Sequence, residues 1–364
     1  MGFREKQERL ELLNLSLYAK KSIDARRWKE EDPDPYRTDY QRDIGRILFS
    51  DAFRRLRMKT QVFLASGSDQ HNRTRLTHTL EVALISKLIA KPLELNLDLT
   101  EAIALGHDLG HTPYGHAGES ALNMCLNGKG TFNHNAQSVW ILRQTLQMRH
   151  DKYGKIFPGY NLTYDVVEGI WKHTDYKHTI KEFDGLQHYN PEKTVSLEGQ
   201  VVDIADGIAY LAHDIEDSIR NNLISVNEVK EVWIENTDVD FRPNTWRHHL
   251  IHDVITFSEG KEDINFSSYT QHLYTQLKSL VKNRVINSER VKKTDAEGKE
   301  KISVIYDYYI RNPEQLINKW TNRNRYINKK YGIERTIIDY IQWLGDENAN
   351  EEYNKICYGR DKVR

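Results

Sequence analysis

Cysteine is scarce in this chain of 364 residues, which holds only Cys125 and Cys357. Two cysteines are too few for a disulfide framework or for a zinc site built from thiolates, and such scarcity is typical of proteins in a reducing compartment. Any metal ion bound by the chain must therefore be held by histidine, aspartate or glutamate.

Long apolar runs and an excess of charge are also missing. No uncharged apolar stretch approaches the roughly 18 residues that cross a bilayer, and the amino terminus lacks the apolar core of a signal peptide. Lysine and arginine number 52 against 53 acidic residues, a formal net charge of -1. No overall field therefore draws the chain to nucleic acid or to an anionic membrane. We expect a soluble, cytoplasmic protein that does not bind membranes and that meets any anion with local charge.

Strand signals are weak, and helical periodicity dominates. Ile302 to Tyr309 is the most β-rich run, although it could also be a buried helix. The segment Thr77 to Leu95 predicts a buried helix, and Leu197 to Leu223 forms the longest helical pattern. The stripe predicted to be buried in the first of these helices comprises Leu80, Ala83, Leu84, Leu88 and Ile89. The sequence therefore predicts an all-α fold.

Composition divides the chain into three parts. Residues 1–40 are polar and charged, with a helix-breaking Asp-Pro-Asp-Pro run at 32–35, and are interpreted as an N-terminal arm over the surface. Residues 41–230 carry the motifs of a catalytic core. Residues 231–364 alternate charged and aromatic helix-like pieces with polar linkers, notably Glu289 to Lys301, and are predicted to form a C-terminal helical region packed on the core.

Histidines are concentrated in the segment Ala104 to Glu119, which reads ALGHDLGHTPYGHAGE. A buried helix gains nothing from several imidazoles, because each needs a hydrogen-bond partner once it leaves water. A divalent metal site, in contrast, needs such groups close together. The segment therefore indicates a site.

The adjacent pair His107-Asp108 can converge on one ion only near a helix end, because neighbouring side chains on a regular helix point about 100° apart. His78 lies in an apolar helix, where a lone histidine is more often a satisfied core residue than a ligand. Asp206, Tyr210 and Asp214 follow each other at four-residue spacing and so share one helix face. Two imidazoles and two carboxylates would suit a divalent cation with open positions for water and a phosphate oxygen. This predicted ligand set comprises His78, His107, Asp108 and Asp206.

Further titratable groups surround these ligands in the sequence. His111, His116 and His134 offer imidazoles that titrate near neutral pH, and Glu119 follows His116 by three residues, a spacing suited to orienting it. No motif for a serine or cysteine nucleophile, and no P-loop, is present. Hydrolysis of a phosphate ester fits this inventory. The remaining histidines, including His173, are interpreted as surface or simply hydrogen-bonded residues.

Five blocks, in order between about Arg37 and Ser225, carry a resemblance: FRRLRMKTQVF, RTRLTHTLEVA, ALGHDLGHTPYGHAGE, HNAQS and VVDIADGIAYLAHDIED. Together they resemble the deoxyguanosinetriphosphate triphosphohydrolase-like proteins of the HD-domain phosphohydrolases. The resemblance implies an HD-domain helical bundle with additional C-terminal helices. It also implies cleavage of a deoxynucleoside triphosphate between the 5' oxygen and the α-phosphorus, giving a deoxynucleoside and tripolyphosphate.

The resemblance also assigns roles to residues. His78, His107, Asp108 and Asp206 would hold a divalent ion, Mg or Mn in the first place, with Ni, Fe or Zn as alternatives. The groups near the scissile ester would be His116 with Glu119 for proton transfer, and His111 and His134 close to the α-phosphate. The substrate-binding residues would be Arg75, Arg54 and Arg55 at the triphosphate, Gln61 and Asp214 at the 3'-hydroxyl, and Tyr210 beneath the deoxyribose. A homo-oligomer and an activating second deoxynucleotide are implied as partners.

Some positions depart from the family pattern, and rival functions stay open. Gly207 and Asn133 stand where acids are usual, and the ending IIDYIQWLGDENA matches only in part. An HD phosphodiesterase or 5'-nucleotidase would use the same four ligands. A non-catalytic module that senses nucleotides or binds single-stranded nucleic acid is the alternative outside enzymes.

Overall fold

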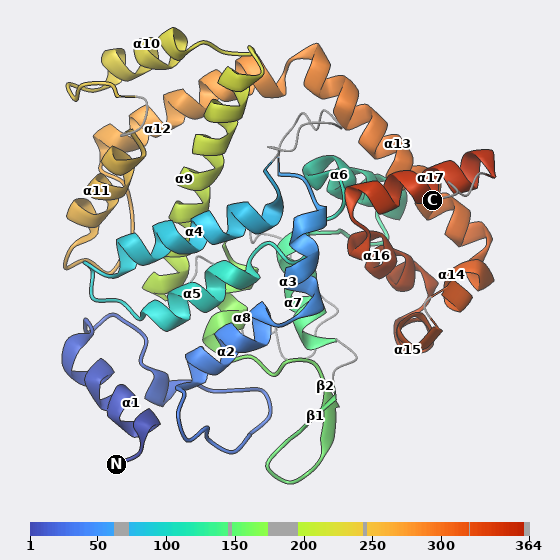
Figure 1. The fold of residues 1–364 in the computed structure, drawn as a ribbon, viewed down its shortest axis with the longest axis horizontal. Helices are drawn as coiled ribbons and strands as arrows, with labels where there is room; N and C mark the ends of the chain where they lie inside the picture. The colour runs from blue at the N-terminus through green and yellow to red at the C-terminus, as the bar shows by residue number, and fades with distance from the viewer. Residues whose placement is uncertain (62–72, 145–147, 174–195, 243–245, 320, 360–364) are drawn as a thin grey trace.

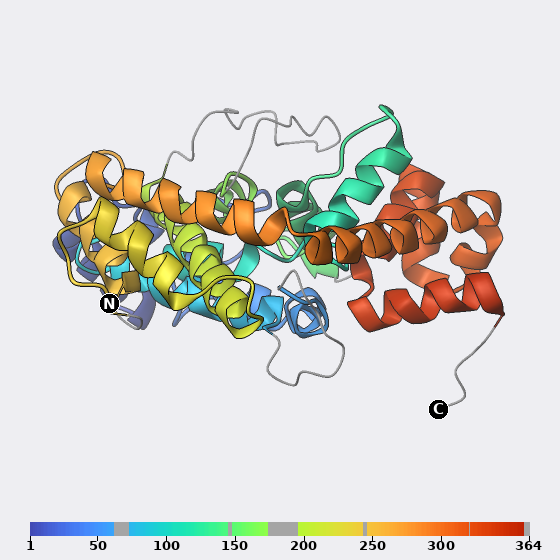
Figure 2. The same cartoon turned by 90° about the horizontal axis from the view of Figure 1, so that it is seen from above.

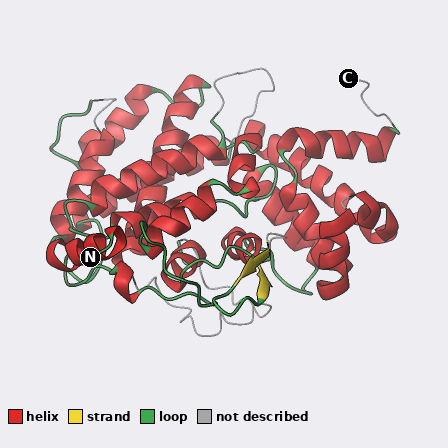
Figure 3. Cartoon of the chain, turned by 60° about the horizontal axis from the view of Figure 1, so that its bottom comes forward, coloured by secondary structure: helices red, strands yellow, loops and turns green. Residues whose placement is uncertain are grey.

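The computed structural model describes residues 1–61, 73–144, 148–173, 196–242, 246–319 and 321–359. Within these ranges the chain forms seventeen α-helices and one two-stranded sheet (Figures 1 and 3), which confirms the predicted all-α fold. The sheet pairs β1 (Met148–His150) with β2 (Ile156–Pro158) in antiparallel fashion. None of the described helices is both long and apolar enough to cross a membrane.

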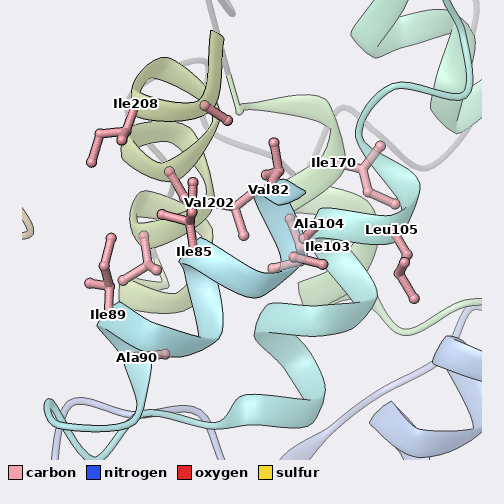
Figure 4. Packing of buried hydrophobic residues seen from close by; sticks show 14 of the residues in the cluster. Val82, Ile85, Ile89, Ala90, Ile103, Ala104, Leu105, Ile170, Val202 and Ile208 are labelled. Atoms are coloured by element: carbon pink, nitrogen blue, oxygen red, sulfur yellow. The ribbon is translucent and has the colours of Figure 1, made fainter. Parts of the chain in front are cut away.

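The larger of two apolar cores includes the helices that position the predicted metal ligands, namely α4 (Arg75–Ala90), α5 (Leu97–Gly106) and α9 (Leu197–Arg220). It also includes α2 (Asp39–Leu48) and α8 (Tyr164–Trp171). Figure 4 shows Val82 and Ile89 of α4 packed among Ile103 of α5 and Val202 of α9. The longest predicted helix, Leu197 to Leu223, agrees with α9 to within three residues.

The buried face of α4 differs from the predicted stripe. Ala83 and Ile89 are buried, but Leu80, Leu84 and Leu88 are 49%, 57% and 46% exposed. Apolar residues surround nearly the whole of this helix, so their periodicity cannot select the face that contacts α5 and α9. The prediction that these three leucines are buried was therefore wrong.

The second core joins α6 (Gly115–Leu126) to the C-terminal helices α13 (Glu289–Arg311), α14 (Pro313–Lys319), α16 (Ile333–Trp343) and α17 (Asp346–Tyr358). The segment Glu289 to Lys301 was predicted to be a linker, but it is helical throughout. It forms the first part of α13, directly after the N-cap residue Ser288. Its buried residues Val291, Gly298 and Ile302 recur at helical spacing. The β-rich run 302–309 continues the same helix.

Most of the other helices also pack on the larger core. Figure 2 shows α12 (Ser268–Val281) and α13 following one another along the long axis, joined by a π-helical turn at Lys282–Ile286. The remaining helices are α1 (Phe3–Asn14), α3 (Asp51–Arg55), α7 (His134–Arg143), α10 (Val226–Asn236), α11 (Trp246–Ser258), α12 (Ser268–Val281) and α15 (Thr321–Tyr331).

The N-terminal segment is bonded to the larger core. Arg27 donates to the carboxylate of Asp39 at 3.0 Å and to the carbonyl of Asn161 at 2.7 Å. The backbone N–H of Lys20 donates to Glu198 of α9 at 3.0 Å. These bonds hold the segment against the helices that carry the site.

Candidate metal centre and active site

Three predicted ligands from three elements meet where α4, α5 and α9 come together. His78 Nε2 lies 2.9 Å from Asp206 Oδ1, and His107 Nε2 lies 3.8 Å from the same oxygen. One ligand atom from each residue lies within 4.8 Å of the others, which is close enough for all three to bind one ion. His213 contacts the other ring nitrogen of His78 at 3.4 Å and so supports the orientation of that imidazole.

His107 offers a nitrogen suited to a cation. It is the C-cap of α5, and its Nδ1 lies 2.6 Å from the carbonyl of Ala104, so Nδ1 carries the proton and Nε2 keeps a lone pair. Nε2 is buried and has no hydrogen-bond partner among the described residues. A buried acceptor without a partner is costly, and a bound cation would satisfy it. The residues present therefore fit a divalent metal ion.

Asp108 lies beside this group and faces a different partner. Its two oxygens accept bonds from Arg75 Nη1 at 3.1 and 2.9 Å, and Oδ1 lies 3.0 Å from His111 Nε2. Burial alone would raise the pKa of Asp108, but Arg75 and then His111 hold it well below its usual range. The carboxylate is therefore ionised, and its role as the fourth ligand stays a prediction.

A cavity of about 290 Å³ opens beside these groups. Gln61 stands in its wall with both side-chain amide atoms buried and without a hydrogen-bond partner in the described part of the chain. Such an amide is available to a ligand. The predicted residues that line the cavity are Gln61, Arg75, His78, Asp108, His111, His116, His134, Asp206 and Tyr210.

A cluster of imidazoles forms another wall. The rings of His111 and His134 stack with centroids 3.9 Å apart and an interplanar angle of 20°. Burial lowers the pKa of His111 well below its usual value, and the charges of Arg75 and His134 lower it further, so His111 is neutral.

Glu119 lies between two of these histidines. It accepts the backbone N–H of His134 at 3.1 Å, and its Oε2 lies 3.1 Å from His134 Nδ1 and 3.6 Å from His116 Nδ1. Burial raises the pKa of Glu119, but the bonds with His116 and His134 more than offset this, so the carboxylate is ionised. Glu119 was predicted to orient His116, and the structure places it closer to His134. His116 is the exposed member of the group, with 61% of its side chain accessible.

Besides His107 and Glu119, three further predicted residues do not line the cavity. Arg54 pairs with Asp51 on the surface of α3, three residues earlier. Arg55 donates to the carbonyl of Trp343 at 2.7 Å and stacks on that indole at 4.2 Å. The structure therefore gives both guanidinium groups protein partners, and their predicted contact with triphosphate stays a prediction.

Asp214 is the third of these residues, and it lies one helical turn beyond Tyr210 on α9. Burial raises its pKa well above the usual range, and the nearby charge of Asp217 raises it further. Burial therefore favours the protonated form of Asp214, which can donate a hydrogen bond as well as accept one.

His173 was missed by the sequence reasoning. It lines the cavity, it is buried, and its ring centroid lies 5.0 Å from that of His107. Burial and the neighbouring His107 lower its pKa to about 3. The signal was present, because His173 follows the apolar helix α8 and contacts the carbonyl of Ile170 at 2.7 Å, just as His107 follows α5. Asn133, at the N-cap of α7, also lines the cavity.

Comparisons with known proteins identify two domains in the chain. The HD domain matches residues 75–215, and the phosphohydrolase-associated domain matches residues 264–355. A hypothetical protein from Aquifex aeolicus, of known crystal structure, is similar over 88% of this chain and 72% of its own chain, with 16% sequence identity and a TM-score of 0.42.

Three curated relatives carry the same name, deoxyguanosinetriphosphate triphosphohydrolase-like protein. The relative from Caldanaerobacter subterraneus subsp. tengcongensis is 39% identical over 98% of this chain and 96% of its own length. The relative from Desulfatibacillum aliphaticivorans is 37% identical over 98% of this chain and 99% of its own. The relative from Rickettsia rickettsii is 34% identical over 94% of this chain and 98% of its own length. With its HD domain and its associated C-terminal domain, this chain belongs to the deoxyguanosinetriphosphate triphosphohydrolase-like family of HD-domain phosphohydrolases.

Proposed function

We propose that the protein hydrolyses deoxynucleoside triphosphates to deoxynucleoside and tripolyphosphate with the help of a divalent cation. The observation that carries this proposal is the buried, partnerless Nε2 of His107 beside His78 and Asp206, at the edge of a cavity that Arg75 lines. The names of the relatives point to the same reaction.

The cation would be held by His78, His107 and Asp206, with Asp108 as the fourth ligand. Bound there, a divalent ion supplies polarisation of a phosphoryl oxygen and acidification of water. Two carboxylates and two imidazoles favour Mg or Mn and are also compatible with Fe, Ni or Zn.

The chain's own side chains would perform the remaining chemistry. Arg75 presents a guanidinium to phosphate oxygens at the wall of the cavity. Water attacks the α-phosphorus, the bond to the 5' oxygen breaks, and His116 at the mouth supplies the proton that the leaving 5' oxygen needs. Glu119, ionised, holds His134 in place, and the neutral His111 stacks against it near the α-phosphate.

The sugar would be selected by the face of α9. The ring of Tyr210 lines the cavity and would lie beneath the deoxyribose, which leaves no space for a 2'-hydroxyl. Gln61 and Asp214 would bond the 3'-hydroxyl. Ribonucleotides should therefore be rejected by crowding. By analogy with the family we also propose a homo-oligomer that binds an activating deoxynucleotide.

Product analysis tests the proposal. The purified protein is incubated with each deoxynucleoside triphosphate, alone and mixed, with Mg or Mn, and products are separated by anion-exchange chromatography. We expect deoxynucleoside and tripolyphosphate, a large but still measurable fall in turnover in His116→Ala, and retained turnover in His150→Ala, whose histidine lies exposed on β1. A nucleoside monophosphate or inorganic phosphate would instead support a phosphodiesterase or 5'-nucleotidase. Equal turnover of ribonucleoside triphosphates would contradict the role of Tyr210.

A further inference from the structure

A short C-terminal segment, Gln342 to Asp346, covers the end of α16 and the start of α17 and lies against the loop that leads to the catalytic histidines. Gly345 packs so closely on the turn at Leu56–Met58 that an added Cβ would lie 2.6 Å from the Cβ of Met58. The segment is about 230 residues from that loop in sequence, and it lies in the phosphohydrolase-associated domain, outside residues 75–215. None of the roles described above uses it.

The carboxylate of Asp346 is hydrogen-bonded to two backbone segments that each lead to a residue lining the cavity. Its Oδ2 accepts the backbone N–H of Thr60 at 2.8 Å, and its Oδ1 accepts the backbone N–H of Tyr114 at 3.0 Å. Thr60 immediately precedes Gln61, and Tyr114 comes two residues before His116. One carboxylate therefore fixes the backbone on two sides of the cavity, through charge-assisted bonds.

The bond to Tyr114 is made at a strained position. Tyr114 has φ +59°, in the left-handed region that side chains other than glycine rarely adopt, and it is the N-cap of α6 without a side-chain cap. Its hydroxyl also donates to the carbonyl of Asp346 at 3.2 Å. The turn directs the chain into Gly115 and His116 at the mouth of the cavity, so a group that holds the turn also holds His116.

Two buried side chains hold the preceding part of the same loop. Gln342 Nε2 donates to the carbonyl of Leu109 at 2.7 Å. Lys59 Nζ donates to the carbonyl of His111 and, at 2.6 Å, to the carbonyl of Gln342. The loop from Asp108 to Gly115 is thus bonded to the C-terminal segment at both of its ends.

We propose that Asp346 is a positioning residue, which sets the places of Gln61 and His116 across the cavity. The C-terminal domain thereby contributes to turnover by aligning the catalytic loop, in addition to its contribution to folding. Two measurements test this proposal. The measurement of turnover rests on the proposed hydrolase function, and the measurement of hydrogen–deuterium exchange does not.

The test compares Asp346→Asn with Glu347→Gln, which removes the same charge from the next, exposed residue of α17. Asparagine keeps one acceptor and turns an N–H₂ group toward the second backbone N–H. We expect hydrogen–deuterium exchange to quicken in peptides that cover Thr60 and Tyr114 in Asp346→Asn, and to be unchanged in Glu347→Gln. Unchanged exchange in Asp346→Asn would overturn the proposal, whether or not the wild-type protein hydrolyses any nucleotide.

A double-mutant cycle separates positioning from general stability. We expect Asp346→Asn to lower kcat about 10- to 100-fold, the range expected for a displacement of the order of 1 Å, and to leave Mn affinity unchanged. In a His116→Ala background the same substitution should lower kcat by a clearly smaller factor, because the imidazole that Asp346 positions is already absent. An equal loss in both backgrounds, measured well below both melting temperatures, would refute positioning. If the wild-type protein hydrolyses no deoxynucleotide, the proposed function fails and the exchange result alone decides on Asp346.

Discussion

Gly110, in the loop between Asp108 and His111, has less space for a side chain than any other glycine that the structure describes near the site. A Cβ built there would lie 2.0 Å from the carbonyl oxygen of His134 and 2.4 Å from the amide nitrogen of Ser138. Both atoms are backbone of α7, so no side chain can rotate away. The φ of Gly110 lies outside the left-handed region, so alanine fits the backbone conformation and only the contact is unfavourable.

The size of the effect of Gly110→Ala follows from these distances. Cβ atoms essentially never approach a heavy atom within 3.0 Å, so the loop and α7 must separate by at least the difference between 3.0 and 2.0 Å, about 1 Å. Overpacking of this kind costs about 1–3 kcal/mol of stability. A displacement of 1 Å between catalytic groups costs about 100-fold in rate. The loop carries Asp108 and His111, and α7 carries His134, so the substitution changes the spacing of the site itself.

Thermal unfolding and steady-state turnover of Gly110→Ala test this reasoning. We expect a lower melting temperature and a loss of activity larger than the loss of stability explains. Gly130→Ala is the matched control, because its Cβ meets nothing within 4 Å and its φ is also ordinary. A Gly110→Ala protein with the stability and activity of the control would refute the close packing of the loop on α7.

Three further predictions concern single side chains. His107→Ala should weaken Mn binding, measured by titration calorimetry, by more than the ~10–100-fold loss that is typical when a residue hydrogen-bonded to a metal ligand is replaced. A fully retained Mn affinity would contradict the assignment of His107 as a ligand. Glu119→Gln should lower kcat ~10–100-fold because His134 loses its ionised partner, with Mn affinity unchanged. Burial raises the pKa of Glu198 to about 7, so the folded state holds a proton that the unfolded state releases near 4.5. Stability should therefore fall by ~3 kcal/mol as pH rises from about 4.5 to 7, and denaturant titrations of Glu198→Gln should lose this slope.

The helical class and the local placement of the candidate metal ligands could be predicted because local chemistry specifies them. His107 lies at the end of α5, where adjacent side chains can converge, as the spacing of the doublet required. Asp206 and Tyr210 share a face of α9 because they are four residues apart. These inferences need only the geometry of a single helix.

The other features depend on which surfaces meet in three dimensions. The leucines of α4 are exposed because α5 and α9 cover other faces of a helix that is apolar nearly all round. The charged opening of α13 is helical because Val291 packs in the larger core and Gly298 lies against Tyr114, although the residues between them resemble a linker. The bonds from Asp346 to Thr60 and Tyr114 join segments that no local pattern connects.

Hydrolysis in ¹⁸O-labelled water tests the central claim most directly, namely that the chain aligns water with the α-phosphorus of a deoxynucleoside triphosphate. The purified protein is supplied with Mn and its preferred substrate, and both products are analysed by mass spectrometry. We predict one ¹⁸O atom in tripolyphosphate and none in the deoxynucleoside. Label in the deoxynucleoside, or in a nucleoside monophosphate with release of phosphate, would contradict the account.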